Sequence, residues 1–140
     1  VAADLYAGVG LFGATVFAGA ASVFNVESSR SASLDAAANL GQRGVIARTE
    51  VSRWRPKRAI DAIVADPARS GLGAPGVKTI EAVGAPVVVV VHCDPASLAR
   101  DAALLAGVGY VPESVTVLDL FPQTHHVETV TRFTTTKQHT

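Results

Sequence analysis

The chain has 140 residues, enough to bury one hydrophobic core and too few for two, so residues 1–140 are expected to form a single domain. Its formal net charge is zero, which excludes a strong overall attraction to nucleic acid. The lone cysteine excludes an internal disulfide and favours a reducing, cytoplasmic setting, and no apolar run is long enough to span a membrane. The absence of methionine and the abrupt start at Val1 indicate the C-terminal fragment of a longer protein, and we expect a monomer.

Apolar periodicity predicts strands that alternate with helices. In chain order, the first half is expected to form a strand at Ala2–Tyr6, a glycine turn and a helix at Val16–Ala20, a strand at Ser22–Val26, a helix at Ser29–Leu40 and a strand at Gly44–Arg48. Ser28 or Ser29 is a suitable N-cap for the second helix, and Gly41 is a suitable stop.

The second half begins with a basic stretch, Val51–Arg58, that is expected to be a loop. It continues with a strand at Ile60–Ala65, a loop at Ser70–Pro75, a helix at Val77–Val83, a strand at Pro86–Val91, a helix at Pro95–Ala106, and strands at Ser114–Leu120 and Val127–Phe133. The continuous β-branched run of Pro86–Val91 is typical of a parallel strand buried on both faces. Together these elements predict an α/β fold, a mainly parallel sheet with helices on both faces.

Two interpretations of the basic stretch stay open. Its cations could contact phosphates while Trp54 stacks on a base. A solvated loop is the commoner structure for such a run, and it is the interpretation that we favour. The basic residues concerned are Arg48, Arg53, Arg55, Lys57 and Arg58.

A glycine-rich segment lies where the first strand meets the first helix, with Asp4 ahead of Gly8, Gly10 and Gly13. Glycines let the backbone pass close to a ligand, and a helix N-terminus favours negative charge. Glu27 ends the next strand, where its carboxylate could accept both hydroxyls of a ribose. The pattern predicts an adenosine-containing cofactor, either S-adenosylmethionine or a nicotinamide dinucleotide, with a turn that binds no ligand as the alternative. The acidic residue before the loop favours S-adenosylmethionine, because methyltransferases of this fold commonly carry one there.

Cys93 follows the strand Pro86–Val91 and precedes Asp94, Pro95 and a helix. Ligands of open parallel sheets bind beyond the carboxyl ends of the strands, and a thiol beside a helix N-terminus more readily forms the thiolate. The residue is therefore a candidate nucleophile, although a buried cysteine that packs as a small apolar side chain fits its position equally well. His92 should point to the opposite side of the strand, so we do not pair it with Cys93.

The segment Phe121–Glu128 contains two adjacent histidines, His125 and His126, followed closely by Glu128. No further cluster of cysteine and histidine supports a metal site, so we expect no metal. Glu128 lies near the start of the last strand, where a carboxylate can act as a general base.

Taken together, these segments resemble the C-terminal domain of the RNA 5-methyluridine (uracil-5-) methyltransferase family, whose members act on tRNA or 23S rRNA. Asp66–Gly71 is similar to the family's D-P-[PA]-R-x-G segment, and His92–Asp101 to its S-C-N-P-x-T-L-A-R-D stretch. Asp119–Glu128 is similar to its D-x-F-P-x-T-x-H-x-E stretch, and the last two motifs are specific. The resemblance covers almost the whole chain and implies a Rossmann-like class I S-adenosylmethionine-dependent methyltransferase fold.

The resemblance also implies a role for each candidate residue. Cys93 is the nucleophile and Glu128 the base, while Asp66 lies between the cofactor and the target base. The cofactor is held by Tyr6 and Glu27, together with Asp4, Gly8 and Gly10 of the glycine segment. The chemistry needs a thiolate at carbon 6 of uracil, since carbon 5 is too electron-poor to attack a methyl group unaided, and a base to remove the carbon-5 proton. The target uridine must be unpaired or flipped out of its stack.

Two residues depart from the family pattern. Asp94 stands where the family usually has Asn and places a negative charge beside Cys93, which opposes thiolate formation. Leu11 replaces a common Asn in the cofactor loop. The family's N-terminal RNA-binding module is not part of the chain, so RNA binding is expected to need it. Two alternatives stay open: a nicotinamide-dependent oxidoreductase, which leaves Cys93 and Glu128 unexplained, and a non-catalytic relic that binds RNA or cofactor.

Overall fold

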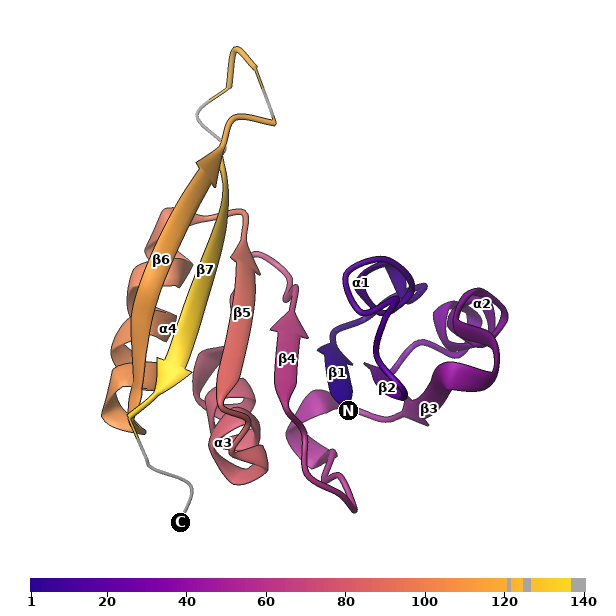
Figure 1. Ribbon diagram of the computed structural model, residues 1–140. Helices are drawn as coiled ribbons and strands as arrows, with labels where there is room; N and C mark the ends of the chain where they lie inside the picture. Colours follow the sequence, from indigo (N-terminus) through magenta and orange to yellow (C-terminus); the bar gives the residue numbers. More distant parts are fainter. Residues whose placement is uncertain (121, 125–126, 137–140) are drawn as a thin grey trace.

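A computed structural model of the chain describes residues 1–120, 122–124 and 127–136. In this part of the chain the strands form one sheet in the order β3-β2-β1-β4-β5-β7-β6 (Figure 1). The parallel strands are β1 (Ala2–Leu5), β2 (Val23–Glu27), β3 (Gly44–Arg48), β4 (Ala62–Ala65) and β5 (Val87–His92). β7 (Glu128–Thr135) lies antiparallel between β5 and β6 (Tyr110–Leu118). The prediction of a mainly parallel sheet is confirmed.

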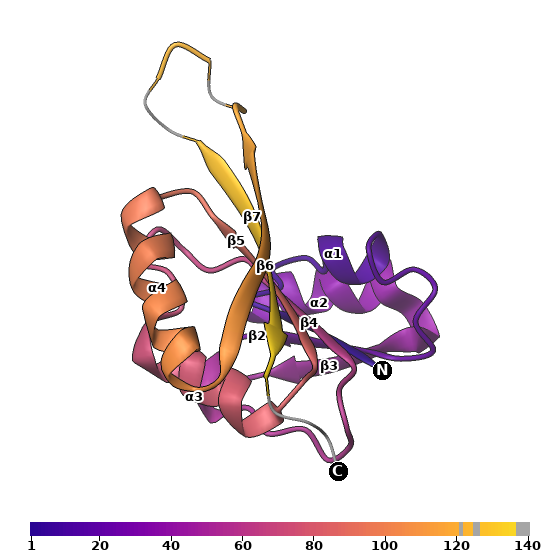
Figure 2. The same ribbon diagram turned by 60° about the vertical axis from the view of Figure 1, so that its left-hand side comes forward.

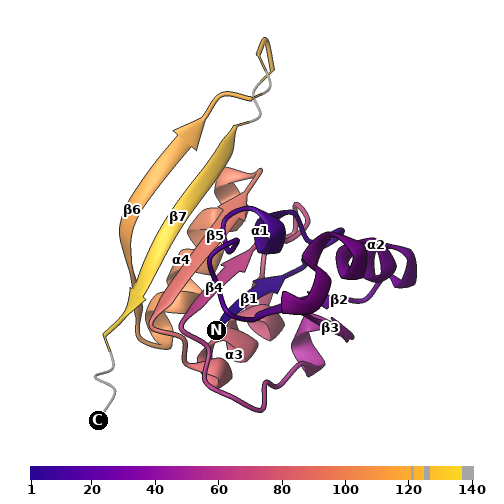
Figure 3. The ribbon, with the colours of Figure 1, turned by 45° about the vertical axis from the view of Figure 1, so that its right-hand side comes forward.

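Helices lie on both faces of this sheet (Figures 2 and 3). One face carries α3 (Gly73–Val83) and α4 (Pro95–Gly107), and the other carries α1 (Leu11–Ala14) and α2 (Arg30–Leu40). Two short 3-10 helices, η1 (Gly41–Arg43) and η2 (Val51–Arg53), precede and follow β3. Among the described residues, no helix has the length and apolar character needed to cross a membrane.

The hydrophobic core lies between the sheet and the α3–α4 layer. Val88 and Val90 of β5 and Phe133 of β7 are fully buried there, against Ile80 of α3 and Leu105 of α4. Burial of an apolar side chain of this size contributes roughly 1.5–3 kcal/mol to stability. This packed layer fixes the positions of β4, β5 and β7, whose ends carry the candidate catalytic residues.

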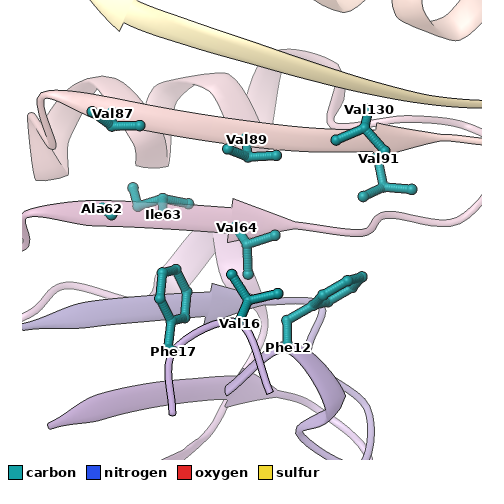
Figure 4. A pocket seen from close by; sticks show the side chains of 10 residues that line it. All are labelled: Phe12, Val16, Phe17, Ala62, Ile63, Val64, Val87, Val89, Val91 and Val130. Carbon is teal, nitrogen blue, oxygen red and sulfur yellow. The ribbon is translucent and has the colours of Figure 1, made fainter. Parts of the chain in front are cut away.

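The opposite face of β4, β5 and β7 is covered only in part. Val87, Val89 and Val91 are half-buried and line an apolar cavity of about 330 Å³ beside Phe12 and Phe17 (Figure 4). We call this cavity the valine groove. Within the described residues, α1 and α2 contact the β1–β3 side of the sheet and leave the groove open. The prediction that this strand is buried on both faces is therefore wrong for one face.

The predicted helix at Val16–Ala20 is also wrong, because α1 ends at Ala14 and turns follow it. The Thr15 hydroxyl donates to the carbonyl of Leu11 at 2.7 Å, and such local side-chain bonds compete with helix propagation. The β-branched Val16 then lowers the helix propensity further, and it stays 65% exposed. The chain consequently leaves the helix after one turn.

α3 begins at Gly73, four residues before its predicted start at Val77. Pro75, which the sequence analysis assigns to a loop, lies in the first turn of the helix, where its missing N–H group is not needed. Two strand starts differ by more than one residue: β4 begins at Ala62 rather than Ile60, and β6 at Tyr110 rather than Ser114.

The basic stretch is anchored to the core rather than being a plain solvated loop. Val51 and Trp54 are buried, and Trp54 packs on Phe24 with ring centroids 5.7 Å apart. Arg55 donates to the carbonyl of Trp54 at 2.6 Å. Because the indole is part of the core, it is not available to stack on a base, while the five basic side chains stay exposed.

Replacing Trp54 by Ala should therefore destabilise the fold. We expect the free energy of unfolding to fall by about 3–5 kcal/mol, the usual cost of removing a large buried aromatic side chain. Urea denaturation followed by circular dichroism measures the change. The exposed neighbour Arg53 provides the control, since Arg53→Ala should alter stability by no more than about 0.5 kcal/mol. Equal stabilities of the two variants would contradict the packing.

Candidate active site

The carboxyl ends of β1, β2, β4 and β5 meet at one edge of the sheet, because these four strands are parallel. The glycine loop (residues 6–10), Glu27, Asp66 and Cys93 follow these strand ends in that order. The structure therefore brings the predicted cofactor residues and the predicted nucleophile to the same edge.

Two carboxylates hold the glycine loop by accepting backbone N–H groups. Asp4, which is fully buried on β1, accepts from Gly13 at 3.0 Å. Glu27, at the end of β2, accepts from Gly8 at 3.0 Å and from Ser29 at 2.7 Å. Asp4 thus binds the glycine segment from the buried side, whereas the Glu27 carboxylate is only half-buried.

Asp4 occupies an apolar environment that does not favour its charge. Burial raises its pKa from 3.8 to about 7, and the nearby negative charge of Asp66 adds to the rise, against a lowering by the Gly13 N–H group. Its Oδ1 atom and both polar atoms of the neighbouring Asn25 have no hydrogen-bond partner among the described residues. A Cβ added at Gly10 would lie 3.0 Å from Asn25 Oδ1, and its φ of 80° also favours glycine. The glycine loop therefore packs closely against the buried polar side chains of Asp4 and Asn25.

Tyr6 is the first residue of the loop and has a φ of 59°, which is unusual for a residue with a side chain. Its hydroxyl reaches the α3 side of the sheet, where a Cβ added at Gly76 would lie 2.8 Å from it. Burial raises the pKa of the phenol, and the negative charges of Asp101 and Glu50 act in the same direction. The hydroxyl is thus directed at α3, on the side of the sheet away from α1.

Asp66 and Glu128 line one cavity of about 290 Å³, next to the valine groove. The other lining residues are apolar: Phe12, Val91, Leu118, Leu120 and Val130. Burial raises the pKa of Asp66, and the nearby His92 opposes this rise. A largely apolar cavity with one carboxylate on β7 and another after β4 can bind an apolar group and offers two groups that can exchange protons with it.

Cys93 directly follows β5, and its side chain is partly exposed. The last pair of the β5–β7 ladder is His92 with Thr129, and the Thr129 hydroxyl donates to the His92 carbonyl at 3.2 Å. Glu128 precedes Thr129 at the start of β7. The predicted nucleophile and the predicted base are therefore chain neighbours of the same ladder pair.

Asp94 has a structural partner that the sequence analysis did not consider. It is the N-cap of α4, and its Oδ2 atom accepts from the N–H group of Ser97 at 2.9 Å. A carboxylate at this position neutralises the positive end of the helix dipole, and Asn is an equally good N-cap. The departure from the family's Asn therefore conserves the cap, and the Asp94 carboxylate is directed at the start of α4.

The sequence analysis missed the residue with the most polar contacts near the site, Asp101 of α4. It is fully buried and accepts from the N–H groups of Leu72 at 2.6 Å and Gly73 at 3.1 Å. It also bonds to Nε2 of the buried His92 at 3.0 Å, so His92 points away from Cys93 as expected. The family stretch that ends at Asp101 was the available signal, but no spacing rule links it to residue 72.

Phe121, His125 and His126 lie outside the described residues, so the histidine pair is not placed. Within the described ranges, no group of three or more histidine, cysteine, aspartate and glutamate side chains could hold a metal ion.

Solved structures define the class of protein. The Pyrococcus abyssi tRNA (uracil-54, C5)-methyltransferase, in complex with S-adenosyl-L-homocysteine, superposes with a TM-score of 0.78 and 30% identity. The match covers 94% of this chain and 33% of that one. The chain has the Rossmann-like fold of S-adenosylmethionine-dependent methyltransferases, as predicted, and this neighbour supports S-adenosylmethionine rather than a nicotinamide as the cofactor.

Sequence relatives narrow the class to RNA methyltransferases. The chain is 39% identical over 138 residues to an uncharacterized RNA methyltransferase of Streptomyces avermitilis, covering 93% of this chain and 32% of the relative. It is 43% identical over 83 residues to the 23S rRNA (uracil(1939)-C(5))-methyltransferase RlmD of Colwellia psychrerythraea, covering 59% and 18%. No family model matches, and the chain spans about a third of the length of the first relatives. The chain is a homologue of RNA methyltransferases that include uracil-5-methyltransferases, which confirms the resemblance.

The buried Asp4 should make stability depend on pH. Its pKa is about 7 in the folded state and near 3.8 when exposed, so between these values the folded state binds more protons. The free energy of unfolding should therefore fall as the pH rises from about 4 to about 7, by up to about 4 kcal/mol. Asp4→Asn keeps an acceptor for Gly13 and should abolish this component in urea titrations.

The control is Asp35→Asn, which changes an exposed carboxylate on α2 and should keep the wild-type pH profile. Parallel profiles for wild type and Asp4→Asn would contradict the assignment of a raised pKa to Asp4.

Proposed function

We propose that the chain is the catalytic domain of an RNA (uracil-5-)-methyltransferase, which transfers a methyl group from S-adenosylmethionine to carbon 5 of a uridine in tRNA or rRNA. The observation that supports the proposal most is the cavity that Asp66 and Glu128 line together with Val91 of β5, the strand that Cys93 follows. An RNA substrate, a cytoplasmic setting and a monomeric protein are parts of the same proposal.

The residues of the glycine loop fit the adenosine part of the cofactor. Gly8 has a φ of 50°, and an added Cβ would meet no atom within 4 Å, so the backbone there borders open space. Glu27 keeps acceptor capacity for ribose hydroxyls beside its two backbone bonds, since a carboxylate has about four lone-pair sites. Asp4, Gly10 and Tyr6 set the shape of the loop. When bound, S-adenosylmethionine supplies an electrophilic methyl group.

The side chains at the strand ends supply the rest of the chemistry. The Cys93 thiolate adds to carbon 6 of the uracil, and the electron pair of the carbon 5–carbon 6 double bond makes carbon 5 nucleophilic. Carbon 5 would then be the acceptor for the sulfonium methyl group, with S-adenosylhomocysteine as the leaving group. Glu128 removes the carbon-5 proton, the double bond re-forms, and the carbon 6–sulfur bond breaks to release Cys93. Asp66, in the same cavity, positions the ring.

The two alternative functions, an oxidoreductase and a non-catalytic relic, differ in which site residues they leave without a role. A nicotinamide-dependent oxidoreductase needs the glycine loop but has no role for Cys93 and Glu128. A relic that binds without reacting would retain the loop and lose the chemistry. The N-cap role of Asp94 weakens the relic interpretation, since the cap supplies a structural reason for a carboxylate at this position.

RNA that contains 5-fluorouridine tests the covalent step, because fluorine at carbon 5 cannot leave as a proton and the adduct accumulates. With S-adenosylmethionine present, the protein should form an adduct that survives denaturing electrophoresis. Cys93→Ser should abolish it and lower methylation of ordinary RNA by more than about 1,000-fold. Glu128→Gln should instead accumulate an adduct with ordinary uridine RNA, since the proton stays on carbon 5.

The control for the base is Glu113→Gln, which removes a carboxylate from β6 that is ion-paired with Arg132. It should methylate at the wild-type rate. Confirmed RNA binding without any adduct in the wild type would favour the relic. Calorimetry that shows tight NAD binding and no response to S-adenosylmethionine would favour the oxidoreductase.

A further inference from the structure

Asp101 connects three segments that are distant in sequence. Its Oδ2 atom accepts the N–H group of Leu72 and its Oδ1 atom that of Gly73, at the start of α3, and Oδ2 also bonds to His92 Nε2 at the end of β5. The neighbouring Arg100 donates to the carbonyl of Ser70. One turn of α4 therefore binds both the loop that follows Asp66 and the strand end that precedes Cys93.

The loop is shaped to receive this carboxylate. Leu72 holds the N-cap position of α3 and has no side-chain acceptor, so Asp101 caps α3 from another helix. Gly71 has a φ of 74°, and an added Cβ would lie 2.2 Å from Asp101 Oδ2. Only glycine fits a backbone that approaches the carboxylate so closely.

The proposed nucleophile, Cys93, lies in a short segment, residues 92–94, that hydrogen bonds hold at both ends. His92 is tied to Asp101, and Asp94 is tied to the Ser97 N–H group at the start of α4. Cys93 lies between them. The position of its sulfur relative to α4 therefore depends on two hydrogen bonds, one on each side.

Stability alone does not explain the presence of a buried histidine at position 92. Its side chain is fully buried, and Nδ1 has no hydrogen-bond partner among the described residues. An unpartnered buried nitrogen is unfavourable, and an apolar side chain would avoid this cost. Its Nε2 bond to Asp101 is the compensating interaction.

We propose that Asp101 is a positioning residue that, through His92 and the N–H groups of Leu72 and Gly73, sets Cys93 and the Asp66 loop in a common geometry. The inference rests on the proposed function for its catalytic consequence, while the physical link can be measured without activity. A shift of the sulfur by about 1 Å costs on the order of 100-fold in rate.

Three variants test the link. His92→Leu removes the donor at similar volume, whereas His92→Gln retains an N–H group at a similar reach. Asp101→Asn weakens all three contacts, and the exposed carboxylate of Asp35 gives its matched control, Asp35→Asn. Hydrogen exchange by mass spectrometry is followed in two peptides, one covering residues 66–73 and the other residues 93–98. The rate of adduct formation with 5-fluorouridine RNA, and kcat and KM for methylation, are measured on the same samples.

We expect His92→Leu and Asp101→Asn to raise exchange in both peptides by about tenfold, the effect of losing one charge-assisted hydrogen bond. Adduct formation and kcat should fall about 10- to 100-fold, with KM for S-adenosylmethionine within about twofold of wild type. His92→Gln should restore both readouts to within about threefold of wild type, and Asp35→Asn should change neither.

Unchanged exchange at residues 66–73 in His92→Leu would overturn the link, whatever the activity. Raised exchange with unchanged kcat and adduct rate would overturn the positioning role. A wild type that binds the RNA and forms no adduct would count against the proposed function alone, and the exchange data would still decide whether Asp101 joins the two segments.

Discussion

The backbone N–H groups that follow a parallel strand need acceptors, and at this edge of the sheet carboxylates supply them. Asp4 and Glu27 hold the loop after β1, Asp94 caps α4 after β5, and Asp101 caps α3 beyond β4. Each acceptor is close to a residue assigned to cofactor or substrate. The edge is therefore built from carboxyl groups that accept backbone N–H groups, and Glu27, which is half-buried, keeps acceptor capacity for a ligand.

This arrangement makes order at the site depend on partners that are distant in sequence. Asp4 and Gly13 are nine residues apart, but Asp101 and Leu72 are 29 apart and Thr129 and His92 are 37 apart. The position of Glu128 depends on β7, which inserts antiparallel between β5 and β6. An antiparallel neighbour brings the start of β7, with Glu128, to the edge of the sheet at which β5 ends, and Cys93 follows β5.

The sequence predicted the strands and their order of appearance because β-branched runs and glycine turns are local signals. It could not predict which strand pairs with β5, and so could not bring Cys93 and Glu128 to one edge of the sheet except through the family resemblance. The same limit explains the errors. The valine run of β5 shows that both faces are apolar, but not that α1 and α2 leave one face open. The end of α1 at Ala14 depends on a hydroxyl of Thr15. The role of Asp101 required knowing that α4 packs beside the start of α3.

Trp54 has a practical consequence that follows from its place in the fold. It is the single tryptophan of the chain, and it packs on Phe24 from within the segment that joins β3 to β4. Its emission therefore comes from one known, buried environment. The protein thus has an intrinsic optical reporter of its folded state.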